Sequence, residues 1–148
     1  MSSLNFCPKC GDPISTRHDG ERERQACVAV GCGFIHFGEF SIGCAGVVTR
    51  EIDGVTKALW QIPGGYAEHD ELLSTAVERE VHEESKVIAS VHDVLAFRHS
   101  LGGSRGGPAT NIYVIFRLNY ESGEPAFDGD EISNAGFYSL EEMEHIEG

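Results

Sequence analysis

The 148-residue sequence predicts an α+β or α/β sandwich preceded by a small cysteine-rich module. Three observations support this fold class. Four of the five cysteines fall within the first 32 residues, and several strand-like and two helix-like stretches follow from residue 40 onward. No apolar run approaches the roughly 18 residues that span a bilayer. We therefore expect two domains, residues 1–38 and residues 39–148, and no membrane partner.

The module of residues 1–38 has few large apolar side chains, so it needs another source of stability. It holds one cysteine pair with two intervening residues and a second pair with four, namely Cys7 and Cys10, then Cys27 and Cys32. The sequence begins without the apolar segment of an export signal, so we expect a cytoplasmic protein, in which such a cluster binds metal more often than it forms disulfides. Four thiolates suit a structural Zn²⁺ ion.

Other interpretations of this module remain. It can hold an iron–sulfur cluster or no metal, and His18 and His36 are substitute ligands because the second cysteine pair is widely spaced. The cysteine-rich module can also contribute to dimerisation or to substrate positioning. We expect it to be a structural cap, in which the metal replaces a core.

Residue 40 begins the larger domain. Residues 40–50 are apolar and rich in small side chains, which is typical of a buried strand, and residues 51–54 form a turn. A short apolar stretch, 58–62, then runs into Pro63-Gly64-Gly65, which we expect to stop any regular element.

A helix is predicted over residues 72–86. Its apolar side chains share one face, which packs on a sheet: Leu73, Ala76, Val77 and Val81. Glu80, Glu83 and Glu84 stand at i, i+3 and i+4, so they lie together within one turn. A hard divalent cation offsets the repulsion among three such carboxylates. The alternative is a solvated acidic face in an acidic protein.

Two more strands are predicted at 91–97 and 111–118, joined by a glycine-rich loop at 101–109. Residues 135–138 form a last strand. Residues 139–142 have the capping-box pattern that opens a helix.

The segment from Gly65 to Val87 resembles the box of the Nudix hydrolase family, G-x5-E-x7-R-E-U-x-E-E-x-G-U, where U is a bulky aliphatic residue. The positions that fit in register are Gly65, Glu71, Arg79, Glu80, Val81, Glu83, Glu84 and Val87. The preceding WQIPGG (residues 60–65) resembles the family's lead-in. The cysteine module resembles the zinc ribbon found in the branch that contains NADH-pyrophosphatase-like members.

The resemblance implies a Nudix-type α/β/α sandwich with a mixed sheet, and an enzyme. The implied reaction is metal-dependent hydrolysis of the pyrophosphate bond in a nucleoside diphosphate linked to another moiety. The substrate would be ADP-ribose, a dinucleotide, a flavin nucleotide or a nucleoside triphosphate. The alternative is a catalytically weak Nudix-fold module that binds a nucleotide or a protein partner. None of the box glutamates is missing, which favours the enzyme.

Site roles carry over by position. The implied Mg²⁺ or Mn²⁺ ligands are Glu80, Glu83, Glu84 and a backbone carbonyl of Gly65 or its neighbour Gly64. Glu83 or Glu84 would also orient or deprotonate the attacking water. Arg79 would pair with Glu71 to hold the helix against the loop.

The sequence departs from the family pattern in four respects. Lys86 replaces the box glycine, which implies a modified exit from the helix. Only residues 55–59 separate Gly54 from Trp60, and the chain ends soon after the last predicted helix begins. Either the substrate pocket is reduced or the sequence lacks segments of the protein, and both interpretations stay open. The downstream signature SQPWPFPxS is absent, so the NADH specificity of that branch does not transfer.

The remaining candidates are single residues. Cys44 is expected to be a small core residue. Arg98, with His99 and Arg105, is a candidate substrate contact or an exposed charge. Glu131, near Asp128 and Asp130, is a candidate acidic ligand or base in the loop before the last strand.

Charge bears on the partners. The chain carries 11 Lys and Arg against 24 Asp and Glu, a formal net charge of −13. Such a surface repels phosphate backbones, so we expect a small-molecule nucleotide substrate rather than nucleic acid. We also expect that a homodimer can form.

Overall fold

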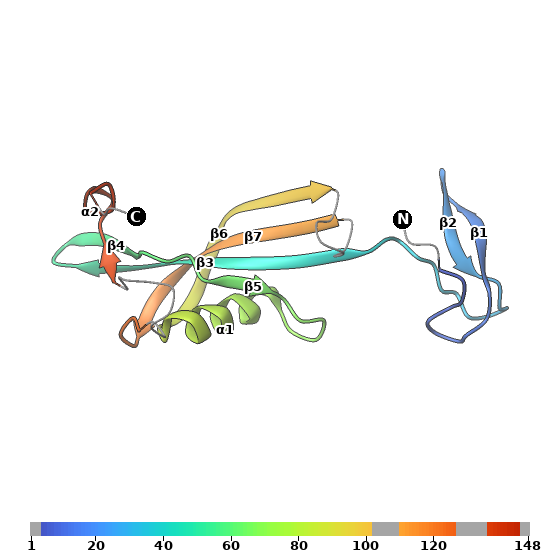
Figure 1. The fold of residues 1–148 in the computed structure, drawn as a ribbon, viewed down its shortest axis with the longest axis horizontal. Helices are drawn as coiled ribbons and strands as arrows, with labels where there is room; N and C mark the ends of the chain where they lie inside the picture. The colour runs from blue at the N-terminus through green and yellow to red at the C-terminus, as the bar shows by residue number, and fades with distance from the viewer. Residues whose placement is uncertain (1–3, 102–109, 127–135, 146–148) are drawn as a thin grey trace. The chain divides into compact units, whose positions relative to one another are not determined.

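A computed structural model describes residues 4–101, 110–126 and 136–145 of the chain. The chain divides into two compact units, residues 1–40 and residues 41–148 (Figure 1). No helix in the described ranges is long and apolar enough to cross a membrane.

The first unit is built around a β-hairpin. Strands β1 (Ile14–Asp19) and β2 (Arg22–Cys27) pair antiparallel, with Ile14 opposite Cys27. Gly20, with φ +65°, makes the turn between them, a conformation that favours glycine. Among the described residues of this unit, Cys7 and Ala26 are the only buried apolar ones. The hairpin therefore has no hydrophobic core of its own.

The second unit contains a six-stranded sheet with the order β6-β7-β3-β4-β8, and β5 pairs with β3. The strands are β3 (Phe40–Ile52), β4 (Val55–Leu59), β5 (Gly64–Tyr66), β6 (Ile88–Leu101), β7 (Thr110–Ser122) and β8 (Phe137–Tyr138). The pairs β3/β4, β3/β5, β4/β8 and β6/β7 are antiparallel. Figure 1 shows β7 running in the same direction as β3, so the sheet is mixed.

Helix α1 (Leu73–Ser85) packs on this sheet through the apolar face that the sequence predicts. Ala76, Val77 and Val81 are fully buried. Gly46 of β3 admits the helix, because an added Cβ there would lie 2.7 Å from the Val81 side chain. Burying a valine side chain contributes about 1.5–3 kcal/mol, so this contact fixes the helix and the direction of its other face.

The predicted fold class, a mixed sheet with few helices after a small cysteine-rich module, is confirmed. The expected capping box at Ser139 is also present and opens α2 (Leu140–Met143). In the described part of the chain, α1 is the only helix longer than one turn.

Two local predictions are wrong. Gly64 and Gly65 do not stop regular structure, because they form β5 against Ala45 and Cys44 of β3. Nor is the exit from α1 modified: Lys86 itself adopts the left-handed conformation, with φ 62°. Its ammonium donates to the carbonyl of Glu83 at 2.8 Å, so it caps a helix end whose dipole favours a cation.

Candidate metal centres

Helix α1 carries the box carboxylates because its apolar face is held on the sheet. Glu80 lies inward of the other two, with 14% of its side chain exposed against 58% for Glu83. Glu84, one turn after Glu80, is exposed. The three residues therefore form a graded acidic surface along one side of the helix.

Arg79 is the centre of the ion-pair network on this surface. Its guanidinium binds Glu71 through two nitrogens, Nη2 at 2.8 Å and Nε at 3.3 Å. Its Nη1 also binds Glu80 at 2.8 Å and Glu83 at 3.1 Å. The pairing with Glu71 lies where the resemblance implied it, whereas the bonds to Glu80 and Glu83 were not foreseen.

The paired carboxylate lowers the free energy of the charged guanidinium, so the hydrogen bond that Arg79 donates to Glu71 raises the pKa of Arg79 further above its usual value. The same bond lowers the pKa of Glu71, and a hydrogen bond from the Glu68 backbone N–H adds to this effect. The loop before α1 and the helix are thus joined by a bidentate pair, a geometry in which Arg and Lys are not equivalent.

The glycines of β5 lie directly against the carboxylates. An added Cβ at Gly65 would stand 2.5 Å from Oε1 of Glu80, so a side chain there would displace the carboxylate. The backbone of Gly64 forms a hydrogen bond with Glu84. Bare backbone is therefore part of the acidic site, which supports the expectation that a carbonyl of this turn adds an oxygen ligand.

Negative charge is in excess at this site. Partial burial raises the pKa of Glu84 above its usual value; the Gly64 hydrogen bond opposes this, and repulsion from Glu80 and Glu83 adds to it. One guanidinium stands against four carboxylates. An all-oxygen donor set with unbalanced charge fits a hard divalent cation.

The four ribbon cysteines converge more closely than the glutamates do. Their Sγ atoms all lie within 4.8 Å of one another, and no second set of three or more acidic, cysteine or histidine ligands converges in this way within the described ranges. The glutamates of α1 do not converge in this way, because the guanidinium of Arg79 lies between Glu80 and Glu83 and binds both of them.

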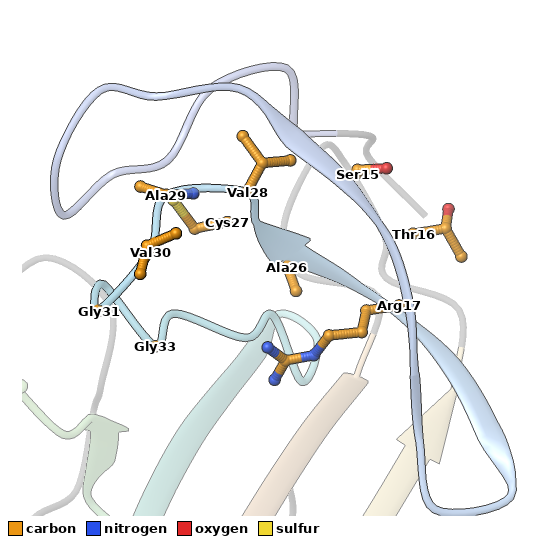
Figure 2. Close-up of a pocket in the computed structure, with 10 residues that line it drawn as sticks. All are labelled: Ser15, Thr16, Arg17, Ala26, Cys27, Val28, Ala29, Val30, Gly31 and Gly33. Carbon is orange, nitrogen blue, oxygen red and sulfur yellow. Dashed lines mark hydrogen bonds between the residues drawn. The ribbon is translucent and has the colours of Figure 1, made fainter.

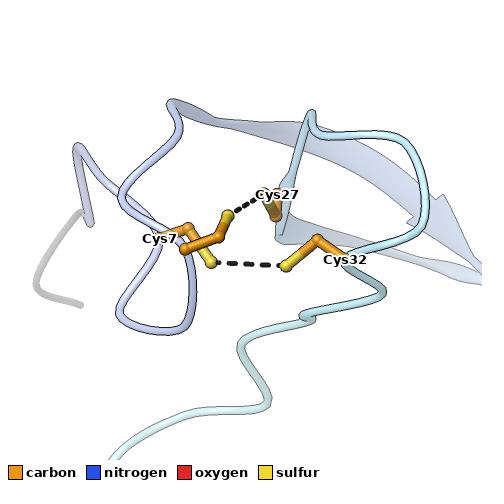
Figure 3. Close-up of side chains that lie close together, drawn as sticks. Cys7, Cys27 and Cys32 are labelled. Carbon is orange, nitrogen blue, oxygen red and sulfur yellow. Dashed lines mark hydrogen bonds between the residues drawn. The ribbon is translucent and has the colours of Figure 1, made fainter.

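The cysteine geometry fits zinc. The Sγ atoms of Cys7 and Cys32 are 3.7 Å apart, and those of Cys10 and Cys27 are 3.4 Å apart (Figure 3). A tetrahedral ion with Zn–S bonds of about 2.3 Å places its ligands about 3.8 Å apart. His18 lies outside the cluster and pairs with Glu23 at 3.6 Å, so four thiols supply the set without a substitute ligand.

Backbone amides also favour thiolates in the ribbon. The N–H groups of Lys9 and Ala29 donate to Cys7 and Cys27, each at 3.4 Å. Although desolvation opposes it, hydrogen bonds from the Lys9 and Cys10 backbone lower the pKa of Cys7 to about 7. In each of the two cysteine loops, a backbone N–H group therefore points at a cysteine sulfur.

The ribbon also has an open groove of about 550 Å³, beside the loop that carries Cys27 (Figure 2). Its lining includes Arg17, Val28 and Val30, and Val30 is fully exposed. It is made by residues of the first unit alone.

The other predicted residues do not join either site. Cys44 is a fully buried core residue of β3, as predicted. Arg98 is exposed on β6, opposite Tyr113 of β7. Arg105, Asp128, Asp130 and Glu131 lie outside the described residues.

Tyr113 is a neighbour of the acidic site that sequence reasoning missed. Burial raises the pKa of its phenol, and the negative charges of Glu84 and Glu80 add to the shift. The only sequence signal for this contact is the pair of glycines, Gly43 and Gly64, that admits the ring.

Comparisons with known proteins agree with this architecture. The family model for the NUDIX domain matches residues 45–148. A NUDIX hydrolase structure from Nitrosomonas europaea covers 94% of this chain and 80% of its own, with a TM-score of 0.57 and 21% identity. The NUDIX domain of Shewanella oneidensis NrtR, crystallised with ADP ribose, covers 71% and 76%, with a TM-score of 0.52 and 17% identity. At these identities the two structures support the fold alone.

Two sequence relatives match across both units. The NAD-capped RNA hydrolase NudC of Vibrio parahaemolyticus is 27% identical over 95% of this chain, and that of Vibrio cholerae is 24% identical over 95%. The chain covers 53% and 51% of these proteins, so it spans about half the length of the curated relatives it matches.

Proposed function

The chain belongs to the NUDIX domain family, and on this premise we propose that it hydrolyses the pyrophosphate bond of a nucleoside diphosphate linked to another moiety. The observation that carries the proposal is the complete set of box carboxylates on α1, placed against the bare backbone of Gly64 and Gly65. A neutral or apolar side chain in place of any of these carboxylates would reduce the excess negative charge that a cation site needs.

The residues that would hold Mg²⁺ or Mn²⁺ are Glu80, Glu83, Glu84 and the Gly65 carbonyl. When bound, such an ion supplies neutralisation of the phosphate charge that develops during hydrolysis. Without it, this acidic surface repels the substrate. Arg79 binds one carboxylate oxygen of Glu80 and one of Glu83, so the second oxygen of each remains available to a cation.

Glu83 or Glu84 is the proposed group that orients or deprotonates the attacking water. Glu83 is exposed and shares its carboxylate with Arg79. Glu84 is held by the backbone of Gly64 instead. Arg79 and Glu71 act indirectly, because their bidentate pair keeps the loop and the helix in register.

The ribbon is proposed to hold one structural zinc through its four cysteines, within a domain of residues 1–38. A closed set of four thiolates leaves no position for water or phosphate, so this ion takes no part in hydrolysis.

The substrate class rests on the relatives. Both are named NAD-capped RNA hydrolases, which places a nicotinamide dinucleotide and its RNA-linked form among the compounds to test. The names also weigh against the prediction that a nucleic-acid partner is disfavoured. ADP-ribose, flavin nucleotides and nucleoside triphosphates remain candidates because SQPWPFPxS is absent.

One observation favours the rival function, a Nudix-fold module that binds without turnover. Arg79 forms ion pairs with two of the three helix carboxylates and so offsets part of their charge internally. A nucleotide-binding protein with little need for a cation would retain such an arrangement.

A substrate panel with Mg²⁺ or Mn²⁺ tests the proposal. It should contain NAD, NAD-capped RNA, ADP-ribose, a flavin nucleotide and a nucleoside triphosphate, with release of the nucleoside monophosphate or pyrophosphate as the readout. Hydrolysis of at least one compound by the wild type, and its loss in Glu84→Gln, is expected. Binding of a compound without release of product would favour the rival.

A further inference from the structure

Tyr113 of β7 lies half-buried against glycine backbone from two neighbouring strands. An added Cβ at Gly43 of β3 would fall 2.5 Å from Cδ2 of the ring. One at Gly64 of β5 would fall 2.7 Å from the phenolic oxygen. Both positions therefore admit the ring only as glycine, and they fix the hydroxyl beside Gly64.

The Tyr113 hydroxyl and the carboxylate of Glu80 lie on opposite faces of strand β5. Side chains alternate between the two faces of a strand, and Gly65 faces Glu80, so its neighbour Gly64 faces the opposite side, where Tyr113 lies. Gly64 also holds Glu84 through its backbone. The backbone of β5 alone lies between Tyr113 and the carboxylates, because the two residues of β5 at this point are glycines and add no side chain.

The hydroxyl is an available donor. In the described part of the chain it has no hydrogen-bond partner, whereas the hydroxyl of Tyr120, on the same strand, donates to the carbonyl of Gly123 at 2.9 Å. The phenolic oxygen is not fully buried, so it is open to solvent and can donate to a ligand that lies beside Gly64.

We propose that the Tyr113 hydroxyl donates a hydrogen bond to a phosphate oxygen of the substrate, which lies across the bare backbone of Gly64. The inference rests on the proposed function and adds a binding residue to it. An anionic diphosphate held at the α1 carboxylates through a cation extends about one strand width, roughly 5 Å, before it meets the attached group. Tyr113 supplies a neutral donor on that path, on a surface that otherwise repels phosphate.

Tyr113→Phe tests the inference because it removes the hydroxyl and retains the ring. We expect kcat/KM to fall about tenfold or more, mainly through KM, since one hydrogen bond to a charged group is lost. Tyr120→Phe is the matched control: it removes the same atom from the same strand and should change kcat/KM by about twofold at most. The concentration of Mg²⁺ that gives half-maximal activity should be unchanged in both.

The measurement should use two compounds that the wild type hydrolyses and that share a diphosphate but differ in the attached group. An equal loss for both in Tyr113→Phe supports a phosphate contact. Unequal losses, or equal activity of Tyr113→Phe and Tyr120→Phe, would overturn it while leaving the proposed function intact. A wild-type protein that hydrolyses nothing would overturn the proposed function and this inference with it.

Discussion

The two units of the molecule reach stability in opposite ways. Residues 1–40 carry four basic and five acidic side chains, and the described residues there bury only Cys7 and Ala26 among apolar side chains. Residues 41–148 carry seven basic and nineteen acidic side chains around an apolar core between α1 and the sheet. Nearly all the negative charge of the chain therefore belongs to the unit with the core.

The two units use clustered metal-ligating side chains in different ways. In the ribbon, four thiols converge to the spacing of a closed tetrahedron, and they replace a core. On α1, carboxylates are spread over one turn and an arginine occupies the space between two of them, because the core already holds the helix. On the proposed function, a metal at the first site would stabilise the fold, and a metal at the second site would serve the reaction.

Glu84→Gln should give the largest effect and should affect the second unit alone. Removing one charge from the proposed cation site, with little change in volume, should lower hydrolysis by about 10²–10³-fold. Steady-state kinetics with the best substrate of the panel measures it. The control Glu141→Gln alters an exposed carboxylate in α2 and should leave the rate unchanged. Activity of Glu84→Gln within a few-fold of the wild type would contradict the assigned site.

Cys10→Ser should affect the first unit alone. The wild type should contain about one zinc per chain, and the variant at least about half less, with a lower melting temperature, because binding energy at a structural site is folding energy. Elemental analysis and thermal unfolding measure the two quantities. Cys44→Ala, in the other unit, should keep its zinc. A full zinc content in Cys10→Ser, or none in the wild type, would disprove the ribbon site.

Arg79→Lys sharpens the comparison within the acidic site. Lysine keeps the charge but cannot form the bidentate bond with Glu71, so we expect about a tenfold loss of kcat/KM without loss of zinc. Glu71→Gln should lose a similar factor, and the double variant should lose little more, since both changes break one contact. Fully additive losses would show that the two residues act separately.

The smallest expected effect concerns pH. The pKa of Glu84 is raised in the folded protein, so its contribution to stability is full below the unfolded value of 4.5 and is lost as the pH rises through the folded pKa. With no divalent ion in the acidic site, Glu84→Gln should therefore melt higher than the wild type at pH 7, and the difference should shrink toward pH 4.5. A melting difference that stays constant from pH 4.5 to pH 8 would contradict the raised pKa that burial and neighbouring charge give Glu84.

The sequence predicted what depends on local pattern. The periodicity of Val77 and Val81 located α1, and a Ser139–Glu142 capping box located α2. The cysteine spacing predicted a cluster, and the structure brings all four sulfurs together.

What could not be predicted depends on contacts between distant segments. β5 forms because Gly64 and Gly65 pair with β3, although glycine and proline locally favour a break. Lys86 adopts a left-handed conformation, and its ammonium donates a hydrogen bond to a backbone carbonyl at the end of α1. The conformational propensity of lysine alone does not include this hydrogen bond. Tyr113 meets Gly43 across 70 positions of sequence, and only sheet order brings them together.

The most direct test of the division between the two sites is a metal-exchange experiment on the wild type. The protein is treated with EDTA until the divalent ions of the acidic site are removed, and zinc and activity are measured before and after Mg²⁺ is added. We predict no hydrolysis after the treatment, full recovery with Mg²⁺ alone, and about one zinc per chain throughout. Full activity with the acidic site free of divalent ions, or activity that follows the zinc content instead of the added Mg²⁺, would contradict the account.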